Sequence, residues 1–426
     1  MDKRRRVVIT GMGVVAPNGS NLEAFEEAIK AGKSGIAHYP ELAELNFKSQ
    51  IGGKPHVTEE EKQEKLPSFI ANKVKKNGVI FACLAGLEAW NDAGLEINPG
   101  AYNHKTGMII GSGALGLDTP INEQINMIDA GNHRRLGSRS VPESMSSGAG
   151  AYLNSILGLT GRVLTNSSAC ITGSEAILQG YEQIRYGKME RMVCGSTEGD
   201  GKYIWAGFDA MRILCSDSND NPTFGSRPMS STSSGFVPSG GAGVMILESL
   251  EAAEARGAKI YAEIIGGDVN SGGQQNGGTM TAQNPDAVVE CIRRSLETAE
   301  INANQIDLIS GHLTSTKGDP FEIKNWVDAL ELPRDKFPLV NTPKSMIGHC
   351  VAGAGSIETI ACALQLSGGF VHPNINLDEV HPDITSLVNE EKLPKQLVKK
   401  ELDIIIKANF GFGDLNCCLV LKRFNK

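Results

Sequence analysis

The chain has 426 residues, 40% of them apolar and 21% charged, with a formal net charge of −8 at pH 7. The negative charge argues against general nucleic-acid binding, and no stretch approaches the ~20 consecutive apolar residues of a membrane span. Nine scattered cysteines without a CxxC pair indicate a reducing, cytoplasmic location and argue against a disulfide framework or a bound metal.

The chain opens with a glycine motif that imitates a nucleotide site. We expect a strand at residues 6–10, running into Gly11-Met12-Gly13-Val14-Val15-Ala16, a formal match to GxGxxG/A. A dinucleotide fingerprint requires a helix that begins in this loop. Here a Pro-Asn-Gly turn intervenes, and the helix at 21–31 starts later, with Ser20 and Glu23 as a capping box. We therefore interpret these glycines as backbone turns.

The remaining elements follow one order twice. In the first part we expect strands at 106–113, 163–165, 191–196 and 240–248 and helices at 73–90, 147–157, 174–186 and 249–256. The pattern restarts at residue 259, with strands at 260–265, 306–310, 340–342, 404–406 and 417–421 and helices at 286–300 and 353–366. Such repetition predicts a duplicated α/β unit with halves at residues 1–258 and 259–426.

Cys170 lies in a turn of small residues, Thr165 to Ser174, between an aliphatic strand and a helix. Unpaired N–H groups and the positive end of the helix dipole favour an anion at such a place. We therefore expect a lowered thiol pKa and a nucleophile. A free cysteine is more often a buried structural residue, so the functional interpretation requires a histidine elsewhere.

Two histidines meet that requirement. His312 follows a predicted strand in a polar loop, and His349 precedes a predicted helix in a turn with Gly348. Phe410 also falls just after a predicted strand. Because ligands of α/β sheets bind outside the carboxyl ends of the strands, we expect these residues to meet Cys170 at one site.

One thiol with two imidazoles suggests acyl transfer followed by carbanion chemistry. A thioester carbon attacked by Cys170 becomes a tetrahedral oxyanion, which preorganised backbone N–H groups stabilise. The N–H of Cys170 and one from the Phe410–Gly413 segment are the candidate donors. Two neutral imidazoles can then donate to an enolate oxygen, which a Cys/His pair used for hydrolysis does not require.

These motifs resemble those of the elongating, decarboxylating β-ketoacyl-acyl carrier protein synthases of the thiolase superfamily. The resemblance runs from Val8 to Gly413. Its most specific motifs are Ser168-Ala169-Cys170, His312 with Thr314 and Thr316, and Lys344-Ser345-Met346-Ile347-Gly348-His349. It implies a thiolase-like α/β fold, in which two related halves form a duplicated five-layer α-β-α-β-α arrangement, and a homodimer.

The resemblance also implies catalytic roles. Cys170 is expected to accept the acyl group, while His312 and His349 support decarboxylation of a malonyl thioester and hold the enolate oxygen. Lys344 is expected to be a fixed charge beside the two histidines, and Glu322 a supporting carboxylate.

Substrate contacts follow from the same resemblance. Thr314 and Thr316 are expected to contact the phosphopantetheine arm, and Phe208 to bind substrate. Phe410 is expected to gate the acyl pocket and to complete the oxyanion hole with its N–H. Arg212 is expected at the entrance for the acidic acyl carrier protein, which local basic residues can steer despite the overall charge. No cofactor is expected, since phosphopantetheine carries the substrates.

The chain departs from the family pattern at three places. Leu313 replaces the usual glycine after the first histidine, and Asp414-Leu415-Asn416 replaces Gly-Thr-Asn. The segment Ser233 to Gly240 lacks the usual Arg-Asp and a nearby glutamate. We expect Leu313 to add bulk beside the active site and Asp414 to add a carboxylate near the Phe410 gate, so that substrate preference and gating differ more than the reaction.

The expected function is therefore 3-oxoacyl-[acyl carrier protein] synthase in type II fatty acid synthesis. Three alternatives stay open: a ketosynthase of a specialised polyketide or aryl-polyene pathway, a thiolase or initiating synthase that uses coenzyme A, and a non-catalytic chain-length partner. Partners that are non-catalytic have lost the nucleophile, whereas Cys170 is present.

Overall fold

The computed structural model describes residues 4–97, 102–114 and 119–425. Its principal strands are β1 (Val7–Val15), β4 (Thr106–Ser112), β5 (Val163–Leu164), β6 (Arg191–Glu198), β7 (Gly241–Ser249), β8 (Ala262–Ser271), β9 (Leu308–Ser310), β10 (Leu339–Asn341), β13 (Ile404–Gly411) and β14 (Leu415–Arg423). They form a sheet in the order β10-β9-β13-β14-β8-β1-β7-β6-β4-β5. Two small sheets pair β2 (Ile36–His38) with β3 (Ile51–Gly53) and β11 (Phe370–Val371) with β12 (Val398–Lys399).

The order of the strands confirms the duplication. The first half reads β5-β4-β6-β7-β1 and the second reads β10-β9-β13-β14-β8, so the chain order within each half is the same. The directions also match, because β4 is parallel to β5 and β6 as β9 is parallel to β10 and β13. The halves join where β1 pairs with β8, from Val7 opposite Ile264 to Ile9 opposite Ala262.

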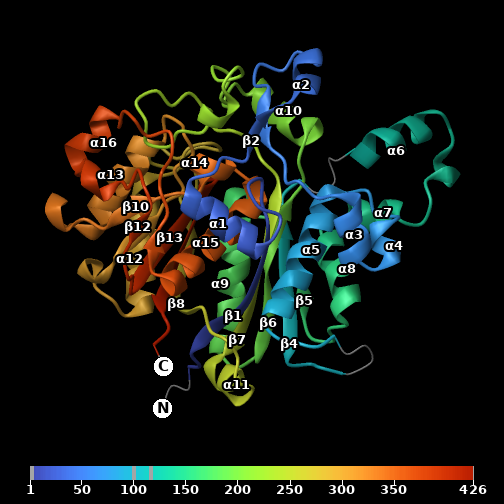
Figure 1. Cartoon of the computed structure of the whole chain (residues 1–426), viewed down its shortest axis with the longest axis horizontal. Coiled ribbons are helices and arrows are strands. Elements are labelled where there is room, and N and C mark those ends of the chain that lie inside the picture. Colours follow the sequence, from blue (N-terminus) through green and yellow to red (C-terminus); the bar gives the residue numbers. More distant parts are fainter. Residues whose placement is uncertain (1–3, 98–101, 115–118, 426) are drawn as a thin grey trace.

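Helices complete the layers (Figure 1). The central pair, α9 (Thr172–Arg185) and α15 (Ala354–Gly368), pack against each other and against strands of both halves. On the outside, α5 (Asn77–Asp92) and α8 (Gly148–Leu157) cover the first half, while α12 (Pro285–Ala299) and α13 (Asp319–Leu330) cover the second. This is the five-layer, thiolase-like arrangement expected from the sequence.

The other helices are peripheral or short. They are α1 (Leu22–Ala31), α2 (Pro40–Glu44), α3 (Glu59–Lys65), α4 (Ser68–Ala71), α6 (Thr119–Asp129), α7 (Ser140–Ser144), α10 (Lys202–Ala210), α11 (Leu250–Ala255), α14 (Lys344–Ile347) and α16 (Pro382–Leu387). Across the described ranges, no helix has both the length and the apolar character that crossing a bilayer requires.

The N-terminal glycine motif differs from the expectation. Gly11 and Gly13 lie inside β1 and not in turns. A Cβ at these positions would lie 2.3 Å from the Ala89 oxygen and 2.0 Å from the Ala85 oxygen, so the glycines allow α5 to pack directly on the strand.

The predicted start of α1 was one residue early. Its N-cap is Asn21, whose Oδ1 accepts from the Ala24 N–H at 2.9 Å, and the predicted Ser20 capping box is absent because the Ser20 hydroxyl donates to the His56 carbonyl. Both residue types cap helices well, so the sequence alone did not separate them.

The C-terminal glycine segment is more regular than expected. The sequence predicted strands only at 404–406 and 417–421, but the segment between them is mostly a hairpin, because β13 continues to Gly411 and β14 begins at Leu415. Helix α13 was not predicted at all, since it begins with Asp319-Pro320 directly after Gly318, a pattern equally typical of a loop.

Candidate active site

Cys170 lies in η3 (Ala169–Ile171), a single turn of 3-10 helix that leads into α9. The preceding Ala169 has a φ of 49°, a left-handed conformation that bends the chain sharply before the thiol. Opposite it, a Cβ at Gly411 would lie 3.1 Å from the Cys170 nitrogen, a tight contact that glycine avoids. Strain and close approach together fix the position of the sulfur.

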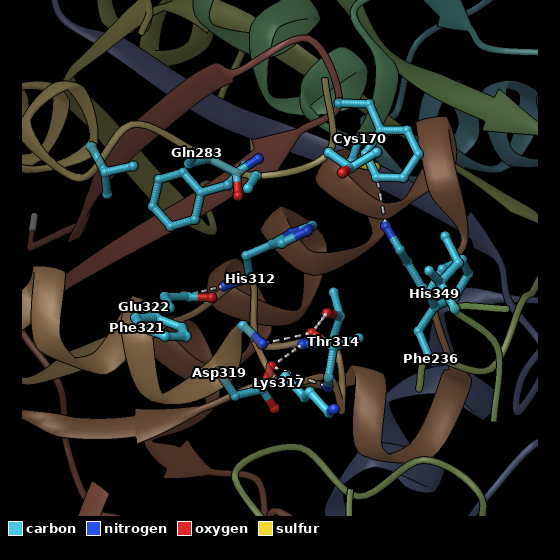
Figure 2. A pocket seen from close by; sticks show the side chains of 18 of the residues that line it. Cys170, Phe236, Gln283, His312, Thr314, Lys317, Asp319, Phe321, Glu322 and His349 are labelled. Atoms are coloured by element: carbon cyan, nitrogen blue, oxygen red, sulfur yellow. Dashed lines mark hydrogen bonds between the residues drawn. The ribbon is translucent and has the colours of Figure 1, made fainter. Parts of the chain in front are cut away.

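Both predicted histidines converge on Cys170. His349 Nε2 lies 3.1 Å from the Cys170 sulfur, and the two imidazole rings stand nearly perpendicular with centroids 5.2 Å apart. A sulfur atom and one ring nitrogen from each histidine all lie within 4.8 Å of one another. Figure 2 shows Cys170 and His349 joined across the cavity, with the His312 ring directed toward the same space. The two halves of the chain thus share one site.

These residues border a cavity of about 630 Å³. Of the residues expected from the sequence, Cys170, His312, His349, Glu322, Thr314, Thr316, Phe410 and Phe208 line it. Two others do not: Lys344 is buried behind the lining, and Arg212 is exposed just after α10. The cavity is therefore built from the predicted constellation, with Lys344 acting from beneath it.

The environment keeps both imidazoles neutral. Burial, reinforced by the Lys344 ammonium, lowers the pKa of His349 to about 3 and holds the pKa of His312 well below its ordinary value. A neutral imidazole carries one ring N–H and can donate it to an oxygen that gains negative charge. The pair is thus suited to hydrogen-bond an enolate.

The expected lowering of the Cys170 pKa was wrong. Burial raises the pKa of this thiol to about 11, and the Lys344 charge and a hydrogen bond from the Phe412 N–H reverse only part of that shift. Desolvation therefore outweighs the helix terminus. At neutral pH the free site holds a neutral thiol beside two neutral imidazoles.

A buried charge cluster of Lys344, Glu358 and Lys407 lies beneath the histidines. Lys344 forms an ion pair with Glu358 Oε1, and Lys407 Nζ lies 3.2 Å from Glu358 Oε2. All three side chains are at most 1% exposed. Burial alone would raise the pKa of Glu358, but the two ammonium groups outweigh it and lower that pKa. Glu358 is thus an anion that holds two cations below the imidazoles.

Glu322, predicted as the supporting carboxylate, binds the backbone instead. Its oxygens accept the N–H groups of His312 and Leu313, both at 2.7 Å, and the indole of Trp326 at 3.3 Å. Burial raises its pKa to about 7. This carboxylate therefore supports the histidine by fixing its loop, while Glu358 pairs with the lysines.

Asp319 acts in the same way one turn earlier. It accepts the N–H groups of Thr314 at 2.9 Å, Ser315 at 3.1 Å and Met229 at 2.8 Å, and burial raises its pKa to about 6. Asp319 and Glu322, here called the loop carboxylates, hold the backbone of the segment 312–316 in place.

The structure separates two roles that were both assigned to Phe410. The N–H that reaches the Cys170 sulfur belongs to Phe412, so Phe410 was the wrong donor. Phe410 lies within β13, where its backbone pairs with Asn416, and its ring packs 6.1 Å from the His312 ring. The reason is the length of β13, which places the tight turn two residues later than expected.

Two of the three departures from the family pattern, Leu313 and Asp414, point away from the cavity. Leu313 has a φ of 24°, and its fully buried side chain joins the apolar core of the second half, so it does not add bulk to the pocket. Asp414 is also fully buried. Its oxygens accept the N–H groups of Gln274 at 2.9 Å and Asn284 at 2.7 Å. Asp414 therefore clamps the segment 272–284, which contributes four residues to the cavity wall.

Sequence reasoning missed several residues of the site. Phe236 packs its ring 5.4 Å from both His349 and Phe208, and Phe412 packs 6.4 Å from Phe208. Lys407 interrupts an otherwise aliphatic strand, Ile404-Ile405-Ile406, and Glu358 interrupts a helix of small and apolar residues. A single charged residue within an otherwise apolar segment was the signal that could have identified Lys407 and Glu358.

The spacing of one thiol and two imidazoles also suits a soft metal ion. Among the described residues, however, the two lysines of the buried charge cluster act electrostatically on both imidazoles. A dication at this position would face that positive charge, so the site fits covalent acyl chemistry better.

A duplicated α/β fold with a cysteine and two neutral histidines at its centre defines an acyl-transferring condensing enzyme. Residues 4–253 match the model for the N-terminal domain of beta-ketoacyl synthases, and residues 261–378 match the model for their C-terminal domain. The chain therefore belongs to the β-ketoacyl synthase family.

Individual relatives agree with this assignment. The chain is 34% identical to the chloroplastic 3-oxoacyl-[acyl-carrier-protein] synthase I of Arabidopsis thaliana, over 99% of this chain and 88% of the relative. It is 34% identical to 3-oxoacyl-[acyl-carrier-protein] synthase 2 of Vibrio harveyi, over 99% of both chains. It also resembles a type II polyketide ketosynthase, solved with its acyl-carrier protein and bound to the hexaketide, at 28% identity and a TM-score of 0.87, over 99% of this chain and 100% of that one.

Proposed function

We propose that the chain is a 3-oxoacyl-[acyl-carrier-protein] synthase of type II fatty acid synthesis. It would transfer an acyl group to Cys170 and condense that group with malonyl-acyl carrier protein, releasing CO₂. The observation that carries this proposal is the convergence of one thiol and two neutral imidazoles within 4.8 Å in a single cavity.

Acyl transfer begins with attack of the Cys170 sulfur on the thioester carbon. The thiol proton passes through His349 Nε2, 3.1 Å away, to the departing phosphopantetheine sulfur. The tetrahedral oxyanion is proposed to accept the N–H groups of Cys170 and Phe412, and a hydrogen bond from the Phe412 N–H to the Cys170 sulfur supports this assignment. The thiol stays protonated until attack, because its pKa is raised.

Condensation follows with malonyl-acyl carrier protein in the same cavity. As the carboxylate leaves as CO₂, its bonding electrons form an enolate whose oxygen accepts imidazole N–H groups. His349 can donate at this stage because the acylated Cys170 no longer gives a proton to Nε2, and no described residue fixes the ring proton on Nδ1. The enolate carbon then attacks the acyl-Cys170 carbonyl, and collapse of the second oxyanion breaks the carbon–sulfur bond. The product is a 3-oxoacyl thioester, and the Cys170 thiolate that leaves takes up one proton from water.

The substrate arm is proposed to run past Thr314 and Thr316, whose hydroxyls lie 3.0 Å apart at the cavity wall. Exposed Arg212 is proposed to meet the acidic carrier protein outside, although it does not line the cavity. The reaction needs no further cofactor, since phosphopantetheine brings both substrates to the cysteine.

The proposal is tested by incubating the protein with an acyl-acyl carrier protein and malonyl-acyl carrier protein. We expect stoichiometric CO₂ and a 3-oxoacyl product detected by mass spectrometry. The matched control is Cys170→Ala, which keeps the cavity but removes the sulfur and should give no condensation product. Folded wild-type protein that forms no product would refute the proposal, and turnover with acyl-coenzyme A alone would favour a thiolase or initiating synthase.

A ketosynthase of a specialised polyketide pathway is the second candidate. It is favoured by the likeness to a polyketide ketosynthase and by the Asp414 clamp on the cavity wall. A panel of acyl-carrier substrates of increasing length and unsaturation separates the two, because a fatty acid enzyme should prefer saturated chains.

We also propose a homodimer in the cytoplasm. Apolar side chains are exposed on α6 and α7, where Ile128 is 52% and Val141 is 72% exposed, and β5 is an edge strand of the same half of the chain. A second copy would cover this surface, and light scattering should give twice the chain mass. A reducing compartment is supported by the nine cysteines, all of which are free thiols.

A further inference from the structure

The proposed reaction requires that His312 present a ring N–H to the substrate, yet a neutral imidazole carries its proton on either nitrogen. Which nitrogen holds it depends on the partner of the other one. His312 lines the cavity, and its Nδ1 faces the protein interior, 3.3 Å from Asn409 Nδ2. The orientation of the Asn409 carboxamide therefore decides where the His312 proton lies.

The oxygen of that carboxamide is fixed from one side. Asn409 Oδ1 contacts the Lys407 ammonium and accepts the Ser174 hydroxyl at 2.6 Å. A lysine ammonium only donates hydrogen bonds. Burial lowers the pKa of Lys407, and the Glu358 carboxylate, 3.2 Å from Lys407 Nζ, opposes that shift and favours the charged form. An amide rotated by half a turn would place its NH₂ group against this ammonium, which excludes that orientation.

The NH₂ group is fixed from the other side. Asn409 Nδ2 donates to Glu358 Oε2 at 2.8 Å, and a carboxylate only accepts. Asn409 is fully buried, so no solvent competes for these bonds. Donor and acceptor ends of one amide are thus set by charges of opposite sign, which is stronger evidence for its orientation than either contact alone.

We infer that Asn409, oriented by Lys407 and Glu358, is a positioning residue that holds His312 with its single ring proton on Nε2. An NH₂ group facing Nδ1 requires Nδ1 to accept, so the proton lies on the nitrogen that faces the cavity. The buried charge cluster therefore influences the substrate indirectly: it orients the uncharged Asn409 amide, and the amide sets the position of the His312 proton. The consequence for decarboxylation rests on the proposed function, whereas the tautomer itself does not.

The tautomer is measured directly in the substrate-free full-length protein. With ¹⁵N-labelled histidine, and with the His312 signals assigned by their loss in His312→Ala, we expect Nε2 to be protonated and Nδ1 to be the unprotonated nitrogen. A proton on Nδ1 in the wild type would overturn the inference, whether or not the protein condenses substrates.

Asn409→Asp is the sharpest variant, since it replaces the NH₂ group by an oxygen of the same shape. We expect the His312 proton to move to Nδ1, malonyl decarboxylation to fall about 10-fold or more in kcat, and KM and Cys170 acylation to change little. Retention of the wild-type tautomer would overturn the inference. Asn341→Asp is the matched control, because Asn341 is an equally buried strand residue outside the site and should leave the His312 signals unchanged.

Lys407→Met tests the source of the orientation. Without the ammonium, the amide keeps only the Glu358 and Ser174 contacts, and we expect the His312 signals to show both tautomers. An unchanged single tautomer would overturn the assignment of Lys407.

Discussion

Three buried carboxylates lie around His312, two in the loop carboxylates and one in the buried charge cluster, and the two groups differ in what they bind. The loop carboxylates, Asp319 and Glu322, accept uncharged N–H groups, mostly from the backbone, and burial raises the pKa of both. In the buried charge cluster, Glu358 lies between Lys344 and Lys407, and its pKa is lowered.

This difference explains how the position and the charge state of His312 are set separately. Its place is set by neutral hydrogen bonds to the backbone of its own loop. Its charge state is set by burial and by cations on other elements, α14 and β13. Stability and rate should therefore change differently when Glu358 of the buried charge cluster or Glu322 of the loop carboxylates is replaced.

The largest effect is expected for Glu358→Gln. This change leaves two ammonium groups buried without an anion, and breaking such an ion pair costs about 3–5 kcal/mol. Denaturant unfolding should show that loss in the free energy of unfolding. If Glu358→Gln were as stable as the wild type, the lysines would not depend on Glu358 and the comparison would fail.

A smaller effect is expected for Glu322→Gln. One amide oxygen can accept only part of what two carboxylate oxygens accept from His312 and Leu313, so we expect about 1–3 kcal/mol less stability. Condensation should slow as well, because the His312 backbone loses its anchor. Trp326→Phe removes the indole contact with Glu322 and some buried volume but leaves both backbone contacts of Glu322, so it serves as the control, with a smaller effect on rate. An equal loss of rate in both variants would contradict the anchoring role.

The pH dependence separates the sets further. The pKa of Glu322 is raised from 4.5 to about 7 in the folded chain, so the folded state keeps a proton that the unfolded state releases first. Its contribution to stability is complete below pH 4.5 and is lost as pH rises to about 7. Unfolding of wild type and Glu322→Gln across this range should differ in slope, the variant lacking this fall. Parallel curves would show that Glu322 does not titrate in this window.

The smallest effect on stability is expected for Asp414→Gly. Asp414 resembles the loop carboxylates, since it accepts the N–H groups of Gln274 and Asn284, but its φ of 62° suits glycine. Loss of the hydrogen bonds is thus partly offset, and we expect about 1 kcal/mol or less. Hydrogen exchange of residues 272–284 should nevertheless accelerate, and acyl chain-length preference should broaden. Unchanged exchange there would show that Asp414 is not a clamp.

Much of the fold and the active site could be predicted from the sequence. What could not be predicted depends on how distant segments pack together. The repeat of strands and helices gave the duplication, and Cys170, His312 and His349 stand in small-residue turns at matching points of it. For the oxyanion donor, the residues alone indicated the Phe410–Gly413 segment and the family resemblance chose Phe410. The length of β13 places the turn at Phe412 instead.

The charge state of the site was beyond local pattern. The helix terminus at Cys170 predicts an easily ionised thiol, whereas the folded environment raises the pKa to about 11. Lys407 and Glu358 lie far apart in sequence, and only the packing of β13 on α15 brings them together beneath the imidazoles. Desolvation and long-range pairing are properties of the fold, so they appear only in the structure.

The central claim is that sulfur and imidazoles perform successive steps in one cavity. Intact-mass analysis after exposure to an acyl-carrier substrate, followed by malonyl-carrier substrate, tests it most directly. We predict an acyl adduct on wild type and on His312→Ala but not on Cys170→Ala, with malonyl substrate discharging the adduct as a 3-oxoacyl product from wild type only. An adduct that persists in Cys170→Ala, or one that His312→Ala discharges at the wild-type rate, would contradict the account.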